Sequence, residues 1–172
     1  MKGGKMYNQL TQKDIAAMEA EIEERKLVIR PQLLEAVKEA RAQGDLSENF
    51  EYYAAKKEKN KNESRIRFLD RMIKTAEIIP DSSKEDEIGM NTRVEVEFEE
   101  DGGREAYKIV TTMRGNSLEG LISVESPIGK ALLGHKVNDR VYVKVNDSFG
   151  YYLIVKKIQK SETENEEKIR SF

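Results

Sequence analysis

The sequence predicts an α+β protein in two parts, an N-terminal antiparallel α-helical hairpin followed by a small antiparallel β-sheet domain with one short helix. Three observations predict this class. Apolar residues recur every three or four positions across 12–77, whereas from residue 94 onward they alternate with a period of two. A polar, helix-breaking stretch that begins at Pro80 separates the two patterns. We expect a hairpin domain over 1–79, a linker over 80–90, a sheet domain over 91–159 and a polar tail over 160–172.

The first helix is predicted over 12–43. Its apolar positions are Ile15, Met18, Ile22, Ile29, Leu33, Val37 and Ala40. Thr11 is a candidate N-cap, and Gly44 supplies the stop signal. Pro31 lies inside the pattern, where its ring removes a backbone donor and crowds the preceding turn. We therefore expect a kink or a slip of the apolar seam at Pro31, rather than a break.

The second helix is predicted over 49–77, with apolar positions at the three- and four-residue spacing of a heptad. Lys59 and Asn62 interrupt this seam near its middle, a feature that usually lowers stability and specifies register. Only a short segment joins the helices, so they must run antiparallel as a hairpin.

Five strands and a short helix are predicted in the second half. Alternating residues over 94–98 and 106–110 flank Asp101-Gly102-Gly103 and form one hairpin. A second hairpin joins 141–145 to 151–155 around Asn146-Asp147-Ser148. A short strand over 121–124 and a helix over 128–133 after Pro127 complete the domain.

Composition excludes several classes of function. With 36% charged residues and a net charge of -2, the chain is not a protein that coats nucleic acid. The absence of cysteine excludes disulfides, zinc–thiolate sites and thiol catalysis. The N-terminus lacks an apolar signal-peptide core, and the longest apolar run, Tyr151 to Val155, is too short to cross a bilayer. We expect a cytoplasmic monomer without a membrane partner.

An acidic turn between the two helices, Gly44 to Tyr53, is the most informative segment. Asp45 as N-cap with Glu48 three residues later would form a capping box for the second helix, and spacing alone favours this interpretation. The alternative is that the two carboxylates bind a hard cation such as Mg²⁺. Two ligands do not complete an octahedral shell, so such a site would need further ligands from a partner.

Basic residues surround this turn on both helices: Arg41, Lys56, Lys57, Lys59 and Lys61. They are either an ordinary solvated face or a short electropositive patch for an RNA phosphate. Tyr52 and Tyr53 could stack on a base, although Tyr52 lies at a seam position that favours packing. His135, the one histidine, has no evident serine or cysteine nucleophile as a partner and is interpreted as a surface or structural residue. The chain also lacks a phosphate-binding loop and a dinucleotide fingerprint, so an autonomous enzyme is not expected.

Two long segments resemble the bacterial Gre transcript cleavage factors. Residues 39–52, which include the acidic turn, are similar to the tip motif of this family almost position for position. Residues 122–134 are similar to its C-terminal signature, and the Arg30-Pro31 pair also recurs there. The resemblance covers roughly 8–158 and is closer to the GreA type.

The resemblance implies a coiled coil followed by a domain similar to FK506-binding proteins, which docks on RNA polymerase at the rim of its secondary channel. The coiled coil then reaches the polymerase active site, where the polymerase cleaves the extruded RNA 3′ end of a backtracked complex. By this resemblance Asp45 and Glu48 help bind a second Mg²⁺, which the factor does not hold alone. The RNA-contacting positions implied are Arg41, Lys56 and Lys57, and the polymerase-docking positions are Ser126, Pro127 and Ile128.

Two other functions remain open from the sequence. A relative of the same architecture could plug the channel and inhibit polymerase without cleavage, although such relatives have altered tips. A prolyl isomerase with a helical arm is a weaker alternative, because the sheet domain offers few aromatic residues to line a peptide pocket.

Overall fold

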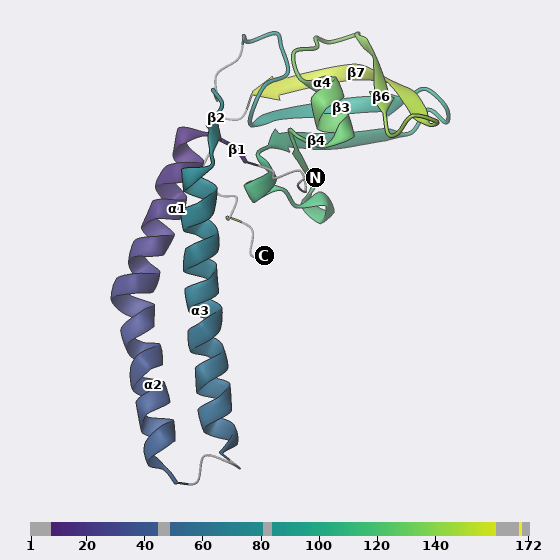
Figure 1. Cartoon of the computed structure of the whole chain (residues 1–172). Helices are drawn as coiled ribbons and strands as arrows, with labels where there is room; N and C mark the ends of the chain where they lie inside the picture. The colour runs from purple at the N-terminus through teal and green to yellow at the C-terminus, as the bar shows by residue number, and fades with distance from the viewer. Residues whose placement is uncertain (1–7, 45–48, 81–83, 161–168, 170–172) are drawn as a thin grey trace. The chain divides into compact units, whose positions relative to one another are not determined.

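The first helical segment of the hairpin is continuous but not uniformly α-helical (Figure 1). In this computed structural model, which describes residues 8–44, 49–80, 84–160 and 169, it consists of α1 (Gln12–Glu24), a π-helical turn (Arg25–Ile29) and α2 (Arg30–Ala42). Arg30 N–H donates to the Arg25 carbonyl, five residues back. This wider turn comes just before α2. Pro31 lies in the first turn of α2, where the backbone N–H that proline lacks is not needed. The expected slip at Pro31 is confirmed.

The second helix, α3 (Phe50–Lys74), runs alongside this segment and confirms the predicted hairpin (Figure 1). Its buried residues are Tyr52, Asn62, Arg65, Ile66, Leu69 and Met72. The polar seam residue Asn62 is 3% exposed, and its amide donates to the Arg25 carbonyl at 3.3 Å. The Arg25 guanidinium donates back to Asn62 Oδ1 at 2.9 Å. Asn62 is therefore matched to the π-helical turn, as expected of a residue that specifies register.

The Glu21 carboxylate lies beside the pair formed by Arg25 and Asn62. Arg65 and Arg25 both donate to Glu21 Oε1, at 2.9 and 2.8 Å. Burial alone would raise the pKa of the Glu21 carboxyl, but the hydrogen bonds from Arg65 and Arg25 outweigh it and lower the pKa below its usual value. Arg30 forms a two-pronged contact with Glu63 at 2.7 and 2.8 Å. Glu21 and Glu63 are thus each paired with an arginine of the opposite arm.

The second half is a five-stranded sheet in the order β5-β4-β3-β7-β6. The strands are β3 (Thr92–Phe98), β4 (Arg104–Val110), β5 (Leu121–Ser123), β6 (Arg140–Lys144) and β7 (Gly150–Lys160), and the helix is α4 (Pro127–Leu132). Both predicted hairpins are present, as the antiparallel pairs β3/β4 and β6/β7. The turn residue Asn146 accepts from the backbone N–H of Ser148 and of Phe149, both at 2.8 Å. The predicted α+β class is confirmed.

Two details of the sheet differ from the expectation. β4 and β5 pair in parallel, so the sheet is mixed and not wholly antiparallel. Two short 3₁₀ turns between these strands, 112–114 and 117–119, carry the chain back toward the start of β4. β7 also continues past Val155 to Lys160. Its register with β3 shifts between Glu95 and Val96, where Lys156 of β7 forms a bulge, and the pairing then goes on.

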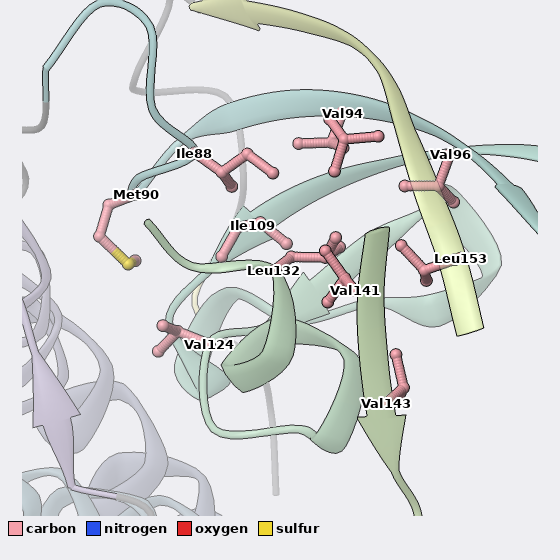
Figure 2. Close-up of a cluster of buried hydrophobic side chains, with 11 residues drawn as sticks. Ile88, Met90, Val94, Val96, Ile109, Val124, Leu132, Val141, Val143 and Leu153 are labelled. Carbon is pink, nitrogen blue, oxygen red and sulfur yellow. The ribbon is translucent and has the colours of Figure 1, made fainter. Parts of the chain in front are cut away.

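The core of the sheet domain is built from aliphatic side chains on the face that α4 covers (Figure 2). Leu132 of α4 packs in one cluster with Val141 of β6 and Leu153 of β7, all at most 2% exposed. Gly129 permits this approach, because a Cβ there would lie 2.1 Å from the Ser123 carbonyl oxygen. A side chain larger than hydrogen would push α4 away from β5.

Tertiary contacts divide the chain into two units, residues 13–76 and residues 1–12 with 77–171. β1 (Gln9–Leu10) pairs in parallel with β2 (Glu77–Ile78), which groups residues 8–12 with the sheet unit rather than with the hairpin. No helix in the described residues is long and apolar enough to cross a membrane.

Candidate functional site

The acidic turn lies between two well-defined helix ends. α2 ends at Ala42, and Gly44 has a φ of +129°, a conformation that L-residues rarely adopt. α3 begins at Phe50 with Asn49 as its N-cap, whose Oδ1 accepts from Tyr52 N–H at 3.0 Å. The interpretation of Asp45 as the N-cap of this helix is therefore wrong. The carboxylates Asp45 and Glu48 lie outside the described residues.

Asn49 also connects the two helices. Its Nδ2 donates to the Ala40 carbonyl at 2.7 Å, so one side chain caps the start of α3 and satisfies a carbonyl in the last turn of α2. The backbone N–H of Gln43 donates to the same carbonyl at 3.3 Å. Asn49 thereby fixes the separation of the two chain ends from which the acidic turn departs. Sequence reasoning missed this residue, although Asn is among the preferred N-cap types.

Arg41 and Tyr52 form the main contact between basic and aromatic residues near the turn. Arg41 Nη2 donates to Tyr52 Oη at 3.2 Å, and its guanidinium carbon lies 5.4 Å from the centre of the ring. The hydrogen bond from Arg41, aided by the positive charges of Lys56 and Lys59, lowers the pKa of the Tyr52 hydroxyl. Tyr52 is 9% exposed, which confirms its predicted packing at the seam.

The predicted basic patch is divided between two faces of α3. Lys56 comes one turn after Tyr52 and lies on the same side of the helix, with Arg41 close by across the hairpin. Lys57 comes one turn after Tyr53 and lies on the side that Tyr53 exposes. The geometry thus unites Arg41 and Lys56 around Tyr52, but it places Lys57 elsewhere.

The second candidate segment is the start of α4. Ser126 is its N-cap and accepts from Gly129 N–H at 3.1 Å, while Pro127 occupies the first turn and is exposed. Ile128 is half-buried and packs against the core of the sheet domain. Of the three predicted docking residues, Pro127 presents the most open surface.

A network of hydroxyl groups supports the segment before α4. Thr112 Oγ1 donates to Glu125 Oε2 at 2.8 Å, and Ser123 Oγ accepts from the backbone N–H of Glu125 at 3.1 Å. Ser126 Oγ also donates to the Ser123 carbonyl at 2.6 Å. These contacts hold the approach to α4 in one conformation and leave its first turn at the surface.

His135 does not belong to a catalytic arrangement in the described residues. Its Nδ1 lies 2.9 Å from Asp139 Oδ2, and the backbone N–H of Lys136 donates to the same oxygen at 3.0 Å. These two contacts lower the pKa of the Asp139 carboxyl, the backbone hydrogen bond contributing more than the histidine. The group closes a turn between α4 and β6, in agreement with the predicted structural role.

Within the described parts of the chain, no group of three or more histidine, aspartate or glutamate side chains is placed to hold a metal ion. The features so far define a class of protein: a paired helical hairpin whose two helix ends flank an acidic turn, followed by a small mixed-sheet domain.

Comparisons with known proteins identify the family. A model described as "Transcription elongation factor, N-terminal" matches residues 8–78, and one described as "Transcription elongation factor, GreA/GreB, C-term" matches 83–160. The chain belongs to the GreA/GreB transcription elongation factor family.

Two curated GreA sequences agree with this assignment. The chain is 39% identical to transcription elongation factor GreA of Lachnoclostridium phytofermentans over 90% of its own length and 96% of that protein. It is 42% identical to GreA of Macrococcus caseolyticus over 78% and 85% of the two chains. The crystal structure of GreA factor homolog 1 of Thermus thermophilus aligns with 28% identity over 90% of this chain and 99% of that one, with a TM-score of 0.41.

Proposed function

We propose that this protein binds RNA polymerase, inserts its hairpin into the secondary channel and stimulates Mg²⁺-dependent cleavage of the RNA 3′ end in backtracked complexes. One observation carries the proposal: the chain is similar to a GreA factor over almost the whole length of both proteins, acidic turn included. The polymerase performs the chemistry, and the factor supplies side chains without being an enzyme itself. Such a factor would act as a monomer in the cytoplasm.

Asp45 and Glu48 are the side chains that we assign to the reaction. Carboxylate oxygens are the donors that Mg²⁺ prefers, and two of them on one turn suit an ion whose remaining ligands come from the polymerase and the RNA. Among the described residues no group of three or more histidine, aspartate or glutamate side chains is placed to hold a metal by itself, which is compatible with a shared site. The metal, when bound, would supply a water molecule of lowered pKa and neutralise charge on the phosphate.

Arg41 and Lys56 would hold the RNA backbone beside the turn. A phosphate that approaches Arg41 meets a guanidinium already oriented by the Tyr52 hydroxyl and ring, so little side-chain freedom is lost on binding. Asn49 would keep the two helix ends at a fixed separation and so limit where the turn can place its carboxylates.

Docking on the polymerase would use the first turn of α4. The exposed ring of Pro127 and the cap Ser126 form the surface of that turn, whereas Ile128 supports it from below by packing on the core. A substitution of Ile128 would therefore act through the stability of the sheet domain more than through direct contact.

The test uses backtracked polymerase complexes whose RNA carries a 5′ label. The parent protein with Mg²⁺ should release short 3′ fragments and shorten the labelled RNA. Asp45→Asn and Glu48→Gln should each slow this by at least about 100-fold. Each replaces a charged metal ligand by a neutral amide, and the loss of a group that only hydrogen-bonds a metal ligand already costs about 10- to 100-fold. Glu58→Gln, which changes an exposed carboxylate on α3, is the matched control and should cleave at the parental rate.

Binding is measured on the same complexes, so that loss of cleavage is separated from loss of docking. Parental cleavage by both Asp45→Asn and Glu48→Gln would refute the role of the turn. If the parent slows nucleotide addition and never shortens the RNA, the protein is instead an inhibitor that plugs the channel.

A further inference from the structure

Two aromatic rings at the start of α3 are exposed to solvent without a structural reason. Phe50 is 84% exposed and Tyr53 is 53% exposed, although neighbouring Tyr52 is buried in the seam. Aromatic side chains are usually buried, and neighbouring aromatic side chains that stay exposed in a charge-rich protein mark binding surfaces. The ring of Tyr53 is also braced, since it meets the Tyr52 ring edge-on with the centroids 5.6 Å apart.

These rings are the first members of a continuous stripe, which consists of Phe50, Tyr53, Lys57 and Lys61. The residues are spaced by three or four positions on α3, so they follow one another along a single face of the helix. Lys57 and Lys61 are both exposed, and within the described residues neither lysine takes part in an ion pair. Along α3, away from the acidic turn, two exposed rings are thus followed by two exposed ammonium groups.

The stripe contains no acidic side chain. With about 100° of rotation per residue, Ser64 falls within its width, whereas Glu58 and Glu51 project roughly 95° and 115° from its centre. On the remainder of the hairpin, acidic and basic residues alternate and several are paired, as Arg30 is with Glu63. Among the described residues of the hairpin, a face that carries aromatic rings and only positive charge is therefore an exception.

Single-stranded nucleic acid is the ligand that this combination fits. Bases stack on exposed aromatic rings with little regard to sequence, while lysines follow the phosphate backbone. An apolar protein surface would match the rings but would leave Lys57 and Lys61 without a counter-charge. We propose that Phe50 and Tyr53 stack on bases of the extruded RNA 3′ segment and that Lys57 and Lys61 contact its phosphates.

This inference rests on the proposed function, which brings RNA to this end of the hairpin, and it adds a second RNA contact to the one around Arg41. Arg41 and Lys56 would hold a phosphate on the Tyr52 side of α3. The stripe would hold unpaired bases on the adjoining side. An RNA segment without bases should therefore bind the stripe more weakly but keep its contact with Arg41 and Lys56.

The test compares two backtracked complexes, one with ordinary nucleotides in the extruded segment and one with abasic nucleotides. All factors carry Asp45→Asn, so that the RNA stays intact while affinity is measured by competition. The parental surface should bind the base-bearing complex about tenfold more tightly, which corresponds to about 1.4 kcal/mol. Phe50→Ala and Tyr53→Ala should each reduce this preference, and the double variant should abolish it.

Three further variants decide whether stacking is the cause. Phe50→Tyr keeps an aromatic face and should keep the preference, whereas Phe50→Leu keeps an apolar side chain and should lose it. If Phe50→Leu retains the preference, or if parental affinity is equal for the two complexes, the stacking inference is overturned. Phe149→Ala removes a similarly exposed ring, 56% exposed, from the other unit and should change nothing.

The outcomes separate this inference from the proposed function. Cleavage by the parent with no effect of RNA bases on affinity would overturn the inference alone. A base-dependent affinity that requires Phe50 and Tyr53, without any cleavage, would uphold the stacking contact and overturn the proposed cleavage. Failure of the parent to bind backtracked complexes would overturn both.

Discussion

The double role of Asn49 leads to a prediction whose size can be worked out from its two hydrogen bonds. Its side chain caps α3 through the Tyr52 N–H at 3.0 Å and satisfies the Ala40 carbonyl at 2.7 Å. Replacement of an Asn N-cap by Ala costs about 1 kcal/mol, and a typical intramolecular hydrogen bond contributes about 1 kcal/mol. Asn49→Ala should therefore lower the free energy of unfolding of the hairpin by about 2 kcal/mol.

Asn49→Ser separates the two contributions. Serine caps helices nearly as well as asparagine, but its side chain is too short to reach across to Ala40, so this variant should lose only about 1 kcal/mol. Urea denaturation followed by circular dichroism at a helix-sensitive wavelength measures both values. If Asn49→Ser is as stable as the parent, the Ala40 bond contributes nothing. If it is as unstable as Asn49→Ala, the cap contributes nothing, and either result refutes the reasoning.

Three further predictions concern other parts of the chain. The arginine partners of Glu21 lower the pKa of its carboxyl in the folded state, so its contribution to stability is present above the ordinary pKa of 4.5 and is lost as the pH falls through the folded pKa. Hairpin stability should therefore decline below about pH 4.5, and Glu21→Gln should flatten this decline in melting curves. Asn62→Ala should cost about 2 kcal/mol in urea denaturation, since it leaves the Arg25 guanidinium and carbonyl without this buried partner; an unchanged midpoint would contradict the role assigned to Asn62. Gly129→Ala should destabilise the sheet domain by about 2 kcal/mol, because its Cβ would overlap the Ser123 carbonyl oxygen; a parental melting temperature would show that α4 can shift freely.

Periodicity was sufficient to predict most of the architecture. The change from a three- and four-residue period to a period of two separates the hairpin from the sheet, and both β-hairpins lie where alternating residues flank turn sequences. Tyr52 was assigned to the seam by spacing alone and is buried there. Such features follow from local patterns of residue types, which are visible in the sequence alone.

The features that could not be predicted depend on contacts between distant residues. The parallel pairing of β4 with β5 follows from the path of the intervening turns, and no local signal distinguishes it from antiparallel pairing. The extension of β7 to Lys160 includes a register shift against β3, at which Lys156 of β7 is passed over. At the acidic turn, Asp45 and Asn49 are both good N-cap types, and the choice of Asn49 is supported by its bond to Ala40 on the other helix.

The helical start of α3 at Phe50 changes how the charged and aromatic residues near the turn must be understood. In the sequence, Lys56 and Lys57 are adjacent and belong to one basic patch, but the helix separates them by about 100°. Lys56 joins Tyr52 and Arg41, whereas Lys57 continues the surface of Tyr53. A factor that holds a phosphate on one side of α3 and bases on the adjoining side can restrain both the position of an RNA strand and its rotation about its own axis. Since a nucleophile must meet the scissile phosphate in line, restraint of that rotation is what a second contact would add to the reaction.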